Sequence, residues 1–227
     1  MNRLPLYLSI AVSLLLNSPA EAHQGTISDG TAIDAEHAIE FVDPQISRVV
    51  YHEVTAAAPQ LWITFEIDSP QSLRIQLGVP YIDNLVDFRP VLALLGPELP
   101  EVELPFDIPE HLGAQLYTAD DQSDPEVFFE PFTGTSSWML IETDVQLPAA
   151  GKYYLVAYVP SEETGKLWVA TGVKEVFSAE DIANLSDTIT DVRAFHEVGP
   201  DAAPPCFLVT LLAGLTAFLG FRSLRRS

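Results

Sequence analysis

Alternation of apolar and polar residues in two neighbouring segments is the feature that most constrains the fold. In the first segment the apolar positions are Leu61, Ile63, Phe65 and Ile67, and in the second they are Leu73, Ile75, Leu77 and Val79. Because successive side chains of a strand point to opposite faces, this period of two predicts half-buried β-strands. The turn residues Asp68-Ser69-Pro70 lie between the segments, so we expect the pair to form a hairpin.

Further strand-like segments, separated by Pro and Gly, predict a mainly β fold. Residues 96–131 are rich in Pro and acidic residues, and we expect a long loop there with two short strands. The predicted class is an antiparallel, jelly-roll-like β-sandwich over residues 43–177, preceded by an N-terminal extension over 23–42. The other predicted strands cover 47–54, 91–95, 114–117, 126–129, 138–147, 153–159 and 167–173.

One amphipathic helix is predicted after the sandwich, within residues 178–197. Ser178 followed three positions later by Asp181 matches a helix-capping pattern. Apolar residues then recur at helical spacing and predict one face against the sandwich. These residues are Ile182, Leu185, Ile189, Val192 and Phe195.

The first 22 residues have the features of a secretory signal peptide. Arg3 precedes an apolar run over residues 6–16, and Ala20-Glu21-Ala22 is a small-x-small cleavage site. Cleavage there leaves His23 as the mature N-terminus. An uncleaved N-terminal anchor is the alternative, although 11 apolar residues are short for a bilayer.

The C-terminal end predicts a membrane anchor. A linker over 198–205 leads to an uncharged run from Cys206 to Phe221, which we predict to be a transmembrane helix. The tail over 222–227 carries three Arg and should remain in the cytoplasm, leaving the sandwich outside. The predicted location is therefore a single-pass protein of the cell membrane with a periplasmic or extracellular domain. A sorting signal that a membrane protease removes is the alternative.

The charge balance excludes one class of partner. Lys plus Arg is 11 and Asp plus Glu is 32, which gives a net charge of −21. Between the two predicted ends, residues 23–205 hold 7 basic and 31 acidic residues, a net charge of 7 − 31 = −24. Nucleic-acid binding needs clustered Lys and Arg and is therefore not expected. Cys206 is the only cysteine, which excludes an internal disulfide and a Cys-rich zinc site.

Several strand and turn motifs resemble known bacterial families. Two segments resemble the last hairpin of bacterial pre-peptidase C-terminal domains, namely Gly151-Lys152-Tyr153-Tyr154 and Gly165-Lys166-Leu167-Trp168. Asp43-Pro44, Glu130-Pro131-Phe132 and the segment 172–177 further resemble exported, membrane-anchored bacterial proteins. The resemblance covers about residues 43–195. It implies a jelly-roll-like sandwich of non-catalytic type on a secreted or surface protein.

Copper is the first candidate ligand. An N-terminal His23 would offer an amine and an imidazole together, which suits Cu(II) and resembles the histidine brace of copper enzymes and carriers. A second imidazole would have to come from His37, His52, His111 or His196. A solvent-exposed N-terminus without metal is the alternative.

Calcium is the second candidate ligand. Asp120, Asp121, Asp124 and Glu126 place carboxylates within seven residues, and hard cations prefer such oxygen ligands. The spacing is not that of an EF-hand, so a solvated acidic loop is the alternative.

Aromatic residues on one strand form the last candidate site. Tyr154 and Tyr158 could form an exposed stripe on which a carbohydrate stacks, whereas core packing is the alternative. Neither Gly-x-Ser-x-Gly nor His-Glu-x-x-His occurs in the chain, and no enzyme activity is expected. The predicted function is non-enzymatic binding or structural support at the cell surface, with a surface protein or a glycan as partner. A copper-binding protein and a calcium-stabilised carbohydrate-binding module are the alternatives.

Overall fold

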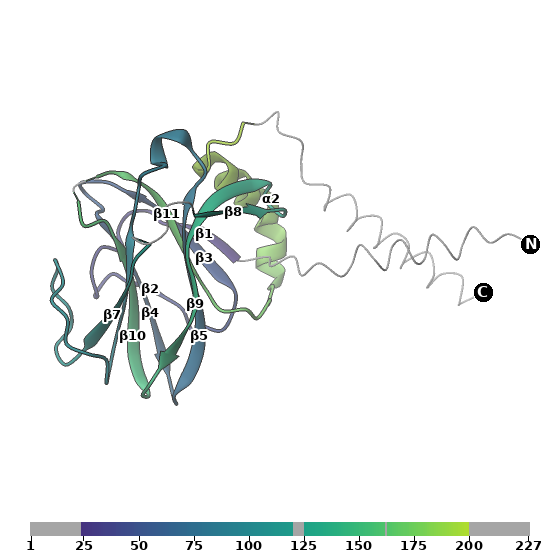
Figure 1. Cartoon of the computed structure of the whole chain (residues 1–227). Coiled ribbons are helices and arrows are strands. Elements are labelled where there is room, and N and C mark those ends of the chain that lie inside the picture. Colours follow the sequence, from purple (N-terminus) through teal and green to yellow (C-terminus); the bar gives the residue numbers. More distant parts are fainter. Residues whose placement is uncertain (1–23, 120–124, 162, 200–227) are drawn as a thin grey trace, which may run out of the picture.

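Two β-sheets pack face to face and enclose the main core (Figure 1). The computed structural model describes residues 24–119, 125–161 and 163–199. The six-stranded sheet has the order β1-β3-β11-β5-β9-β8, and the five-stranded sheet has the order β2-β4-β10-β6-β7. The strands are β1 (Gln24–Ile27), β2 (Ile39–Glu40), β3 (Arg48–Val54), β4 (Gln60–Ile67), β5 (Gln71–Pro80), β6 (Val91–Gly96), β7 (Gly113–Tyr117), β8 (Glu126–Glu130), β9 (Thr135–Leu147), β10 (Gly151–Tyr158) and β11 (Gly165–Thr171).

The strands β3 to β11 confirm the predicted β segments. β1 and β2 lie in the predicted N-terminal extension and have no alternating pattern that would predict them. β1 pairs in parallel with β3, and β2 pairs in parallel with β4. Both sheets are therefore mixed. The ladders among β3 to β11 are antiparallel, as predicted for residues 43–177, and the parallel pairs come from the two strands of the N-terminal extension.

The predicted hairpin of the two alternating segments is wrong. β4 pairs with β2 and β10, whereas β5 pairs with β9 and β11 in the other sheet. The turn at 68–70 carries the chain from one sheet to the other. The apolar faces of both strands belong to the same core cluster, so the two strands face each other across the sandwich. Alternation identifies a buried face, but it does not distinguish strands that lie side by side from strands that lie face to face.

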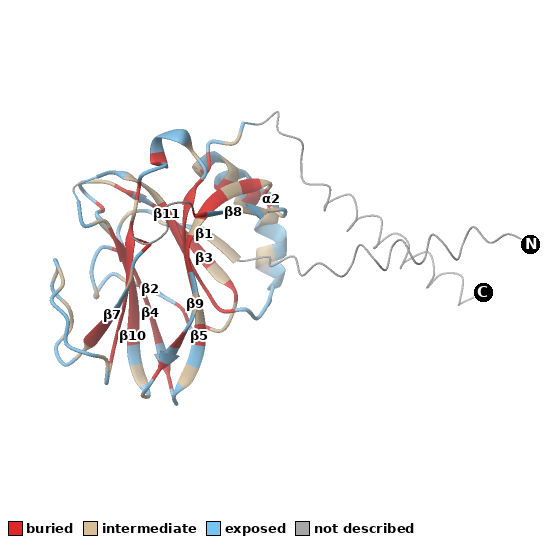
Figure 2. Cartoon of the chain, in the orientation of Figure 1, coloured by how far each residue is buried: buried red, intermediate tan, exposed pale blue. Residues whose placement is uncertain are grey.

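The segments that resemble the last hairpin of pre-peptidase C-terminal domains, β10 and β11, have the same arrangement and lie in different sheets. β10 pairs with β4 and β6, and β11 pairs with β3 and β5. The segment between them therefore also crosses between sheets. Figure 2 shows the buried residues along both sheets, in agreement with one core between them.

Each sheet has a second, outward apolar face that another segment covers. Residues 97–112, which we call the strap, pack on the outer face of the five-stranded sheet through Leu104, Phe106, Ile108 and Leu112. The exposed side chains of the strap include Glu98, Glu101, Glu103, Asp107 and Glu110. The Pro- and acid-rich loop is thus amphipathic, with its apolar residues on the sheet and its carboxylates in solvent.

Helix α2 (Ala179–Phe195) covers the outer face of the six-stranded sheet. Ser178 and Asp181 form the predicted capping box, in which each side chain binds the backbone N–H of the other residue. Val192 and Phe195 pack against Tyr51 and other residues of the sheet, as the helical spacing predicts. Ile182 is exposed, so the first residue of the predicted apolar face does not contact the sheet.

Several predicted features lie outside the described residues. These are the signal peptide (1–22), His23, the greater part of the linker, the membrane segment (206–221) and the basic tail (222–227). Of the helices within the described ranges, none is long and apolar enough to span a bilayer.

Candidate functional site

A serine and a histidine meet under the C-terminal end of α2. Ser137 Oγ on β9 lies 3.1 Å from His196 Nε2, and Trp168 Nε1 on β11 donates to the same oxygen at 2.9 Å. His196 Nδ1 lies 2.8 Å from the Val192 carbonyl oxygen, which can only accept. Nδ1 of His196 therefore carries a proton, and in the neutral imidazole Nε2 accepts the hydroxyl proton of Ser137.

This pair has the contacts of a nucleophile and its base, but it is not accessible to a substrate. Ser137 and His196 are both buried, and the Tyr51 ring packs edge-on against the imidazole at 5.6 Å. Burial, with a smaller effect of Lys166, lowers the pKa of His196 to about 4. The pair thus fastens α2 to the sheet rather than activating a hydroxyl for chemistry.

The other histidines considered for copper do not converge. His52 is buried, with Nε2 near the Ala58 carbonyl oxygen (3.1 Å) and Nδ1 near Ser28 Oγ (3.2 Å). His37 is exposed and pairs with Asp34, and this hydrogen bond raises the pKa of the imidazole. His111 is exposed in the strap. Each lies in a separate environment, and His23 itself is outside the described residues.

The predicted calcium cluster is described at one position only. Asp120, Asp121 and Asp124 lie outside the described residues, and Glu126 is the exposed first residue of β8. Within the described ranges, no three His, Cys, Asp or Glu side chains come together in a group that could hold a metal ion.

The expected stripe of Tyr154 and Tyr158 is wrong, because both side chains are only 6% exposed. Phe106 of the strap packs edge-on against Tyr158 at 5.1 Å and against Trp62 at 5.5 Å. Trp62 in turn contacts Tyr154 at 5.7 Å. The strap therefore covers the aromatic face on which a sugar would have to stack.

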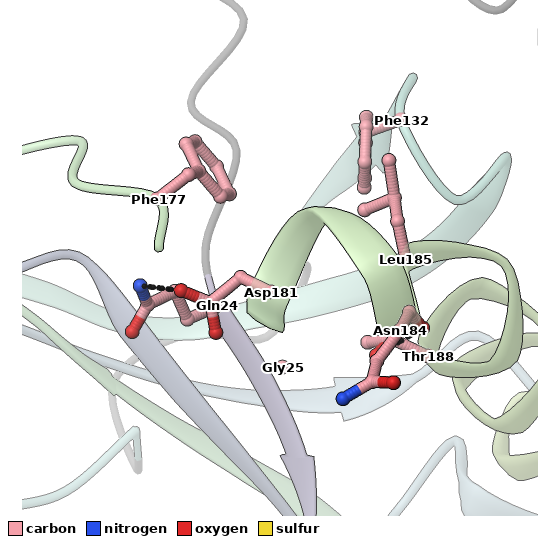
Figure 3. A pocket seen from close by; sticks show the side chains of 8 residues that line it. All are labelled: Gln24, Gly25, Phe132, Phe177, Asp181, Asn184, Leu185 and Thr188. Carbon is pink, nitrogen blue, oxygen red and sulfur yellow. Dashed lines mark hydrogen bonds between the residues drawn. The ribbon is translucent and has the colours of Figure 1, made fainter. Parts of the chain in front are cut away.

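A hollow of about 200 Å³ lies between the N-terminal half of α2 and β1 (Figure 3). Gln24 Nε2 donates to Asp181 Oδ2 at 2.9 Å and also to the Val176 carbonyl oxygen. Asp181 accepts from the backbone of Ser178 as well. These polar groups are used to fix the start of α2 to β1, while Phe132 and Leu185 form an apolar wall.

A second hollow, of about 400 Å³, lies at one end of the sandwich. The turns after β3 and after β10 line it with small and hydroxyl side chains and the carboxylate of Glu163. Among the described residues, its lining contains the hydroxyls of Thr55, Ser161 and Thr164 but no imidazole that could act as their general base.

Large apolar side chains are exposed beside the rim of the core, at the β8 end of the six-stranded sheet. Tyr81 is 53% exposed, Val127 is 49% exposed and Phe129 is 58% exposed. We call these three residues the β8 patch. Apolar side chains that remain in solvent as a group mark interaction sites more often than single exposed residues do.

The strand register places the β8 patch on one face. Val127 pairs with Trp138, and Phe129 pairs with Ser136, whose carbonyl oxygen accepts from the Tyr81 N–H at 2.9 Å. The Tyr81 and Trp138 rings lie 4.7 Å apart. Residues paired across an antiparallel ladder share a face, so Tyr81, Val127 and Phe129 extend the surface of Trp138 into solvent.

The turn after β8 reaches the helix on the opposite side. Thr133 accepts a hydrogen bond from Arg193 Nη1 of α2 at 3.0 Å, and Phe132 lies beside Leu185 (Figure 3). The hairpin of β8 and β9 thus curls over α2 and leaves the β8 patch on its outer side. The sequence pattern predicts β8 but not this patch. The usable signal is the apolar triplet 127–129 in a strand flanked by Glu126 and Glu130.

Comparisons with known proteins return structures but no family. No family model matches the chain, and no curated protein matches it. A similar solved structure is the pre-peptidase C-terminal domain of a collagenase from Bacillus anthracis, at 12% identity and TM-score 0.32, covering 59% of this chain and 93% of that chain.

Two further similar structures are PliG proteins, periplasmic inhibitors of g-type lysozyme. The Salmonella Typhimurium protein is 12% identical, with TM-score 0.29 and coverage of 60% of this chain and 98% of that chain. The Aeromonas hydrophila protein is 14% identical, with TM-score 0.32 and coverage of 66% of this chain and 99% of that chain. The pre-peptidase C-terminal family, which the strand motifs resemble, is thus also represented among the structures similar to this chain.

Proposed function

We propose that this chain is an exported, membrane-tethered and non-enzymatic binding module whose partner is a basic protein. The observation that carries the proposal is the β8 patch, three large apolar side chains exposed together on an acidic domain. Aromatic anchors with charged surroundings are the usual composition of protein-binding surfaces.

The charge of the chain selects the kind of partner. A net charge of −21 favours encounter with cationic surfaces and disfavours acidic ones. The neighbourhood of the patch has the same sign, since Glu126 precedes Val127 and Asp83 follows Tyr81 by two residues, and both carboxylates are exposed. Arg89 in the same segment donates to the carbonyl oxygens of Val86 and Phe88 and so is used within its own loop.

A structural role for the Ser137–His196 pair supports the non-enzymatic part of the proposal. Both side chains are buried beneath α2, and their hydrogen bonds connect the helix to Trp168. The arrangement that would otherwise suggest a nucleophile is accounted for by packing.

Export and tethering rest on the predicted signal peptide and membrane segment. Mass spectrometry of the mature protein should find His23 at the N-terminus, and the protein should sediment with membranes after an alkaline wash. A mature N-terminus elsewhere would also eliminate the copper brace. For the two candidate ions, Cu(II) and Ca²⁺, a titration that raises the melting temperature would support a site, because a ligand that binds the native state stabilises it.

The binding proposal is tested with a random peptide library displayed on phage and selected on the full chain in mild detergent. We expect enriched peptides to combine Lys or Arg with β-branched or aromatic residues, and to bind as purified synthetic peptides. A Val173→Lys variant and a Phe129→Lys variant serve as a matched pair, because the native side chains are 59% and 58% exposed. Loss of binding in the Phe129 variant alone would assign the contact to the β8 patch.

Two outcomes would overturn the proposal. One is enrichment of acidic or compositionally random peptides. The other is saturable binding of an oligosaccharide array in the absence of any peptide binding, which would favour a glycan as partner.

A further inference from the structure

We infer that β8 receives its partner by strand addition, pairing its free edge with an extended basic segment. The inference rests on the proposed function and adds the mode of recognition. In such complexes the main chain supplies affinity, and alternate side chains supply specificity.

β8 is an open edge of this sandwich. The sheets have four edge strands, β1, β8, β2 and β7. α2 covers β1, since a Cβ on Gly25 would lie 3.3 Å from Thr188 Cγ2, and β2 is two residues long. The strap flanks the start of β7, where Ala114 N donates to the Pro100 carbonyl oxygen at 2.7 Å. β8 pairs with β9 on one side, and within the described ranges no strand pairs with its other side.

The interior of β8 carries no residue that blocks pairing at this edge. Sandwich edges are usually blocked by Pro, Lys or a bulge, which prevent pairing with other chains. Pro125 and Pro131 flank β8, but the strand itself contains no Pro, Lys or bulge: Val127, Phe128 and Phe129 occupy its centre, and its register with β9 is regular. All three have high strand propensity, and two of them are about half exposed.

The acidic ends of β8 determine which strand can pair there. If two copies paired antiparallel about Phe128, Glu126 of one copy would lie opposite Glu130 of the other. Like charges directly opposite each other destabilise a ladder, and the net charge of −21 adds to the repulsion. A segment with basic residues at both ends avoids this repulsion and is attracted to the carboxylates of β8. The occupant is therefore a cationic segment rather than a second copy.

The two faces of β8 define the side chains of the partner. Positions opposite Val127 and Phe129 lie on the face of the β8 patch and favour apolar residues. Positions opposite Glu126 and Glu130 lie on the other face and favour Lys or Arg. Glu126 is exposed, whereas Glu130 Oε1 already accepts a hydrogen bond from the Phe132 N–H, so we expect Glu126 to contribute more of this preference. The complementary pattern is therefore basic, apolar, any residue, apolar, basic.

The experiment uses a capped, fluorescent peptide with the core Lys-Val-Thr-Val-Lys and the full chain in mild detergent. One control peptide has both Lys replaced by Glu, and a second has Pro in place of Thr, which removes a backbone donor without changing the charge. Binding is measured by fluorescence anisotropy, and hydrogen exchange of residues 125–139 reports whether the ladder extends. The protein variants are Glu126→Lys, Phe129→Lys and the control Val173→Lys, with melting temperatures to confirm folding.

We expect the Lys peptide to bind and to slow exchange in β8, and both control peptides to bind about tenfold more weakly or worse. Phe129→Lys should weaken binding of the Lys peptide by a similar factor, and Val173→Lys should leave it unchanged. Glu126→Lys should reduce the difference in affinity between the Lys peptide and the peptide in which both Lys are replaced by Glu.

Equal affinity for the Lys peptide and its Pro-containing control would overturn strand addition. So would an affinity of the Phe129→Lys variant for the Lys peptide that equals that of the native chain. So would the absence of binding by the Lys peptide. If the library selection still yields basic peptides in any of these cases, the proposed function stands and only the mode of recognition fails.

Discussion

The indole ring of Trp168 on β11 lies directly over Gly78 on the neighbouring strand β5. The two residues are paired in the ladder, and a Cβ on Gly78 would come within 2.2 Å of Trp168 Cζ2. The same ring donates from Nε1 to Ser137, which in turn binds His196. Gly78 therefore provides the space in which Trp168 connects the sheet to the end of α2.

Replacing Gly78 with Ala should destabilise the fold, because the new methyl group would overlap the buried ring of Trp168. We expect a loss of about 1–3 kcal/mol in the free energy of unfolding, the usual effect of overpacking. Urea titration followed by tryptophan fluorescence measures it. Gly199→Ala is the matched control, because among the described residues no atom outside the chain neighbours lies within 4 Å of a Cβ at that position. Equal stability of the two variants would contradict the close contact.

Stability should fall as the pH is lowered from about 6.5 to about 4. Burial lowers the pKa of His196 to about 4, whereas the unfolded chain titrates near 6.5. Between these values the unfolded state binds a proton that the native state does not, so the free energy of unfolding decreases as pH falls and levels off below pH 4. The difference amounts to about 3 kcal/mol. Burial also lowers the pKa of His52, which acts in the same direction.

His196→Gln isolates this contribution. The variant should be less stable at pH 7 because it loses the hydrogen bond to Ser137, but its stability should depend less on pH between 6.5 and 4. Urea titrations at several pH values give the pH dependence of the free energy of unfolding for the native chain and for the variant. The contributions of the carboxylates are the same in both and cancel when the two are compared. A variant with the same slope as the native chain would show that His196 does not carry the effect.

Phe106→Ala should loosen the strap from the five-stranded sheet. The ring is half-buried between Trp62 and Tyr158, so we expect a loss of about 2 kcal/mol, less than for a fully buried Phe. Acrylamide quenching of tryptophan fluorescence should increase as Trp62 becomes accessible. Val102→Ala, in the same strap but outside the aromatic cluster, should change neither quantity. Unchanged quenching in the Phe106 variant would show that the strap is held in another way.

Ser178→Ala should destabilise α2 from its N-terminal end. The substitution removes the side-chain acceptor of the Asp181 N–H, which typically costs about 1 kcal/mol. Ser186→Ala, at an exposed position within the helix, is the control and should have little effect. Hydrogen exchange of residues 178–185 should speed up in the first variant only, and equal exchange in both would contradict the capping role.

Local patterns predict the elements of this fold well. Alternation and turn residues identify β3 to β11, and the spacing from Ser178 to Asp181 marks the start of α2. These features depend on neighbours in the chain. β1 and β2 have no local signal because they are short and gain their stability from parallel partners. These partners lie 24 residues later in the chain, as in the pairs Gln24–Arg48 and Ile39–Ile63.

The arrangement of those elements is harder to predict. The apolar face of β4 looks the same whether its partner lies beside it or across the core, which is why the hairpin with β5 is wrong. Tyr154 and Tyr158 occupy the outward phase of β10, and residues distant in the chain account for their burial: Trp62 on β4 packs against Tyr154, and Phe106 of the strap packs against Tyr158. The β8 patch depends in the same way on register between β5, β9 and β8.

The contacts that hold the end of α2 also determine how the domain responds to mechanical force. Lys166 donates to the Phe195 carbonyl oxygen and pairs with Glu197, and Arg193 donates to Thr133 and Gly199. A force applied to the chain beyond Gly199 therefore acts first on these contacts of Lys166 and Arg193. It is shared between β11, which carries Lys166, and the β8–β9 hairpin, which carries Thr133. The helix would not peel off one turn at a time under load. Tension would be carried into the six-stranded sheet, where several ladders must yield together.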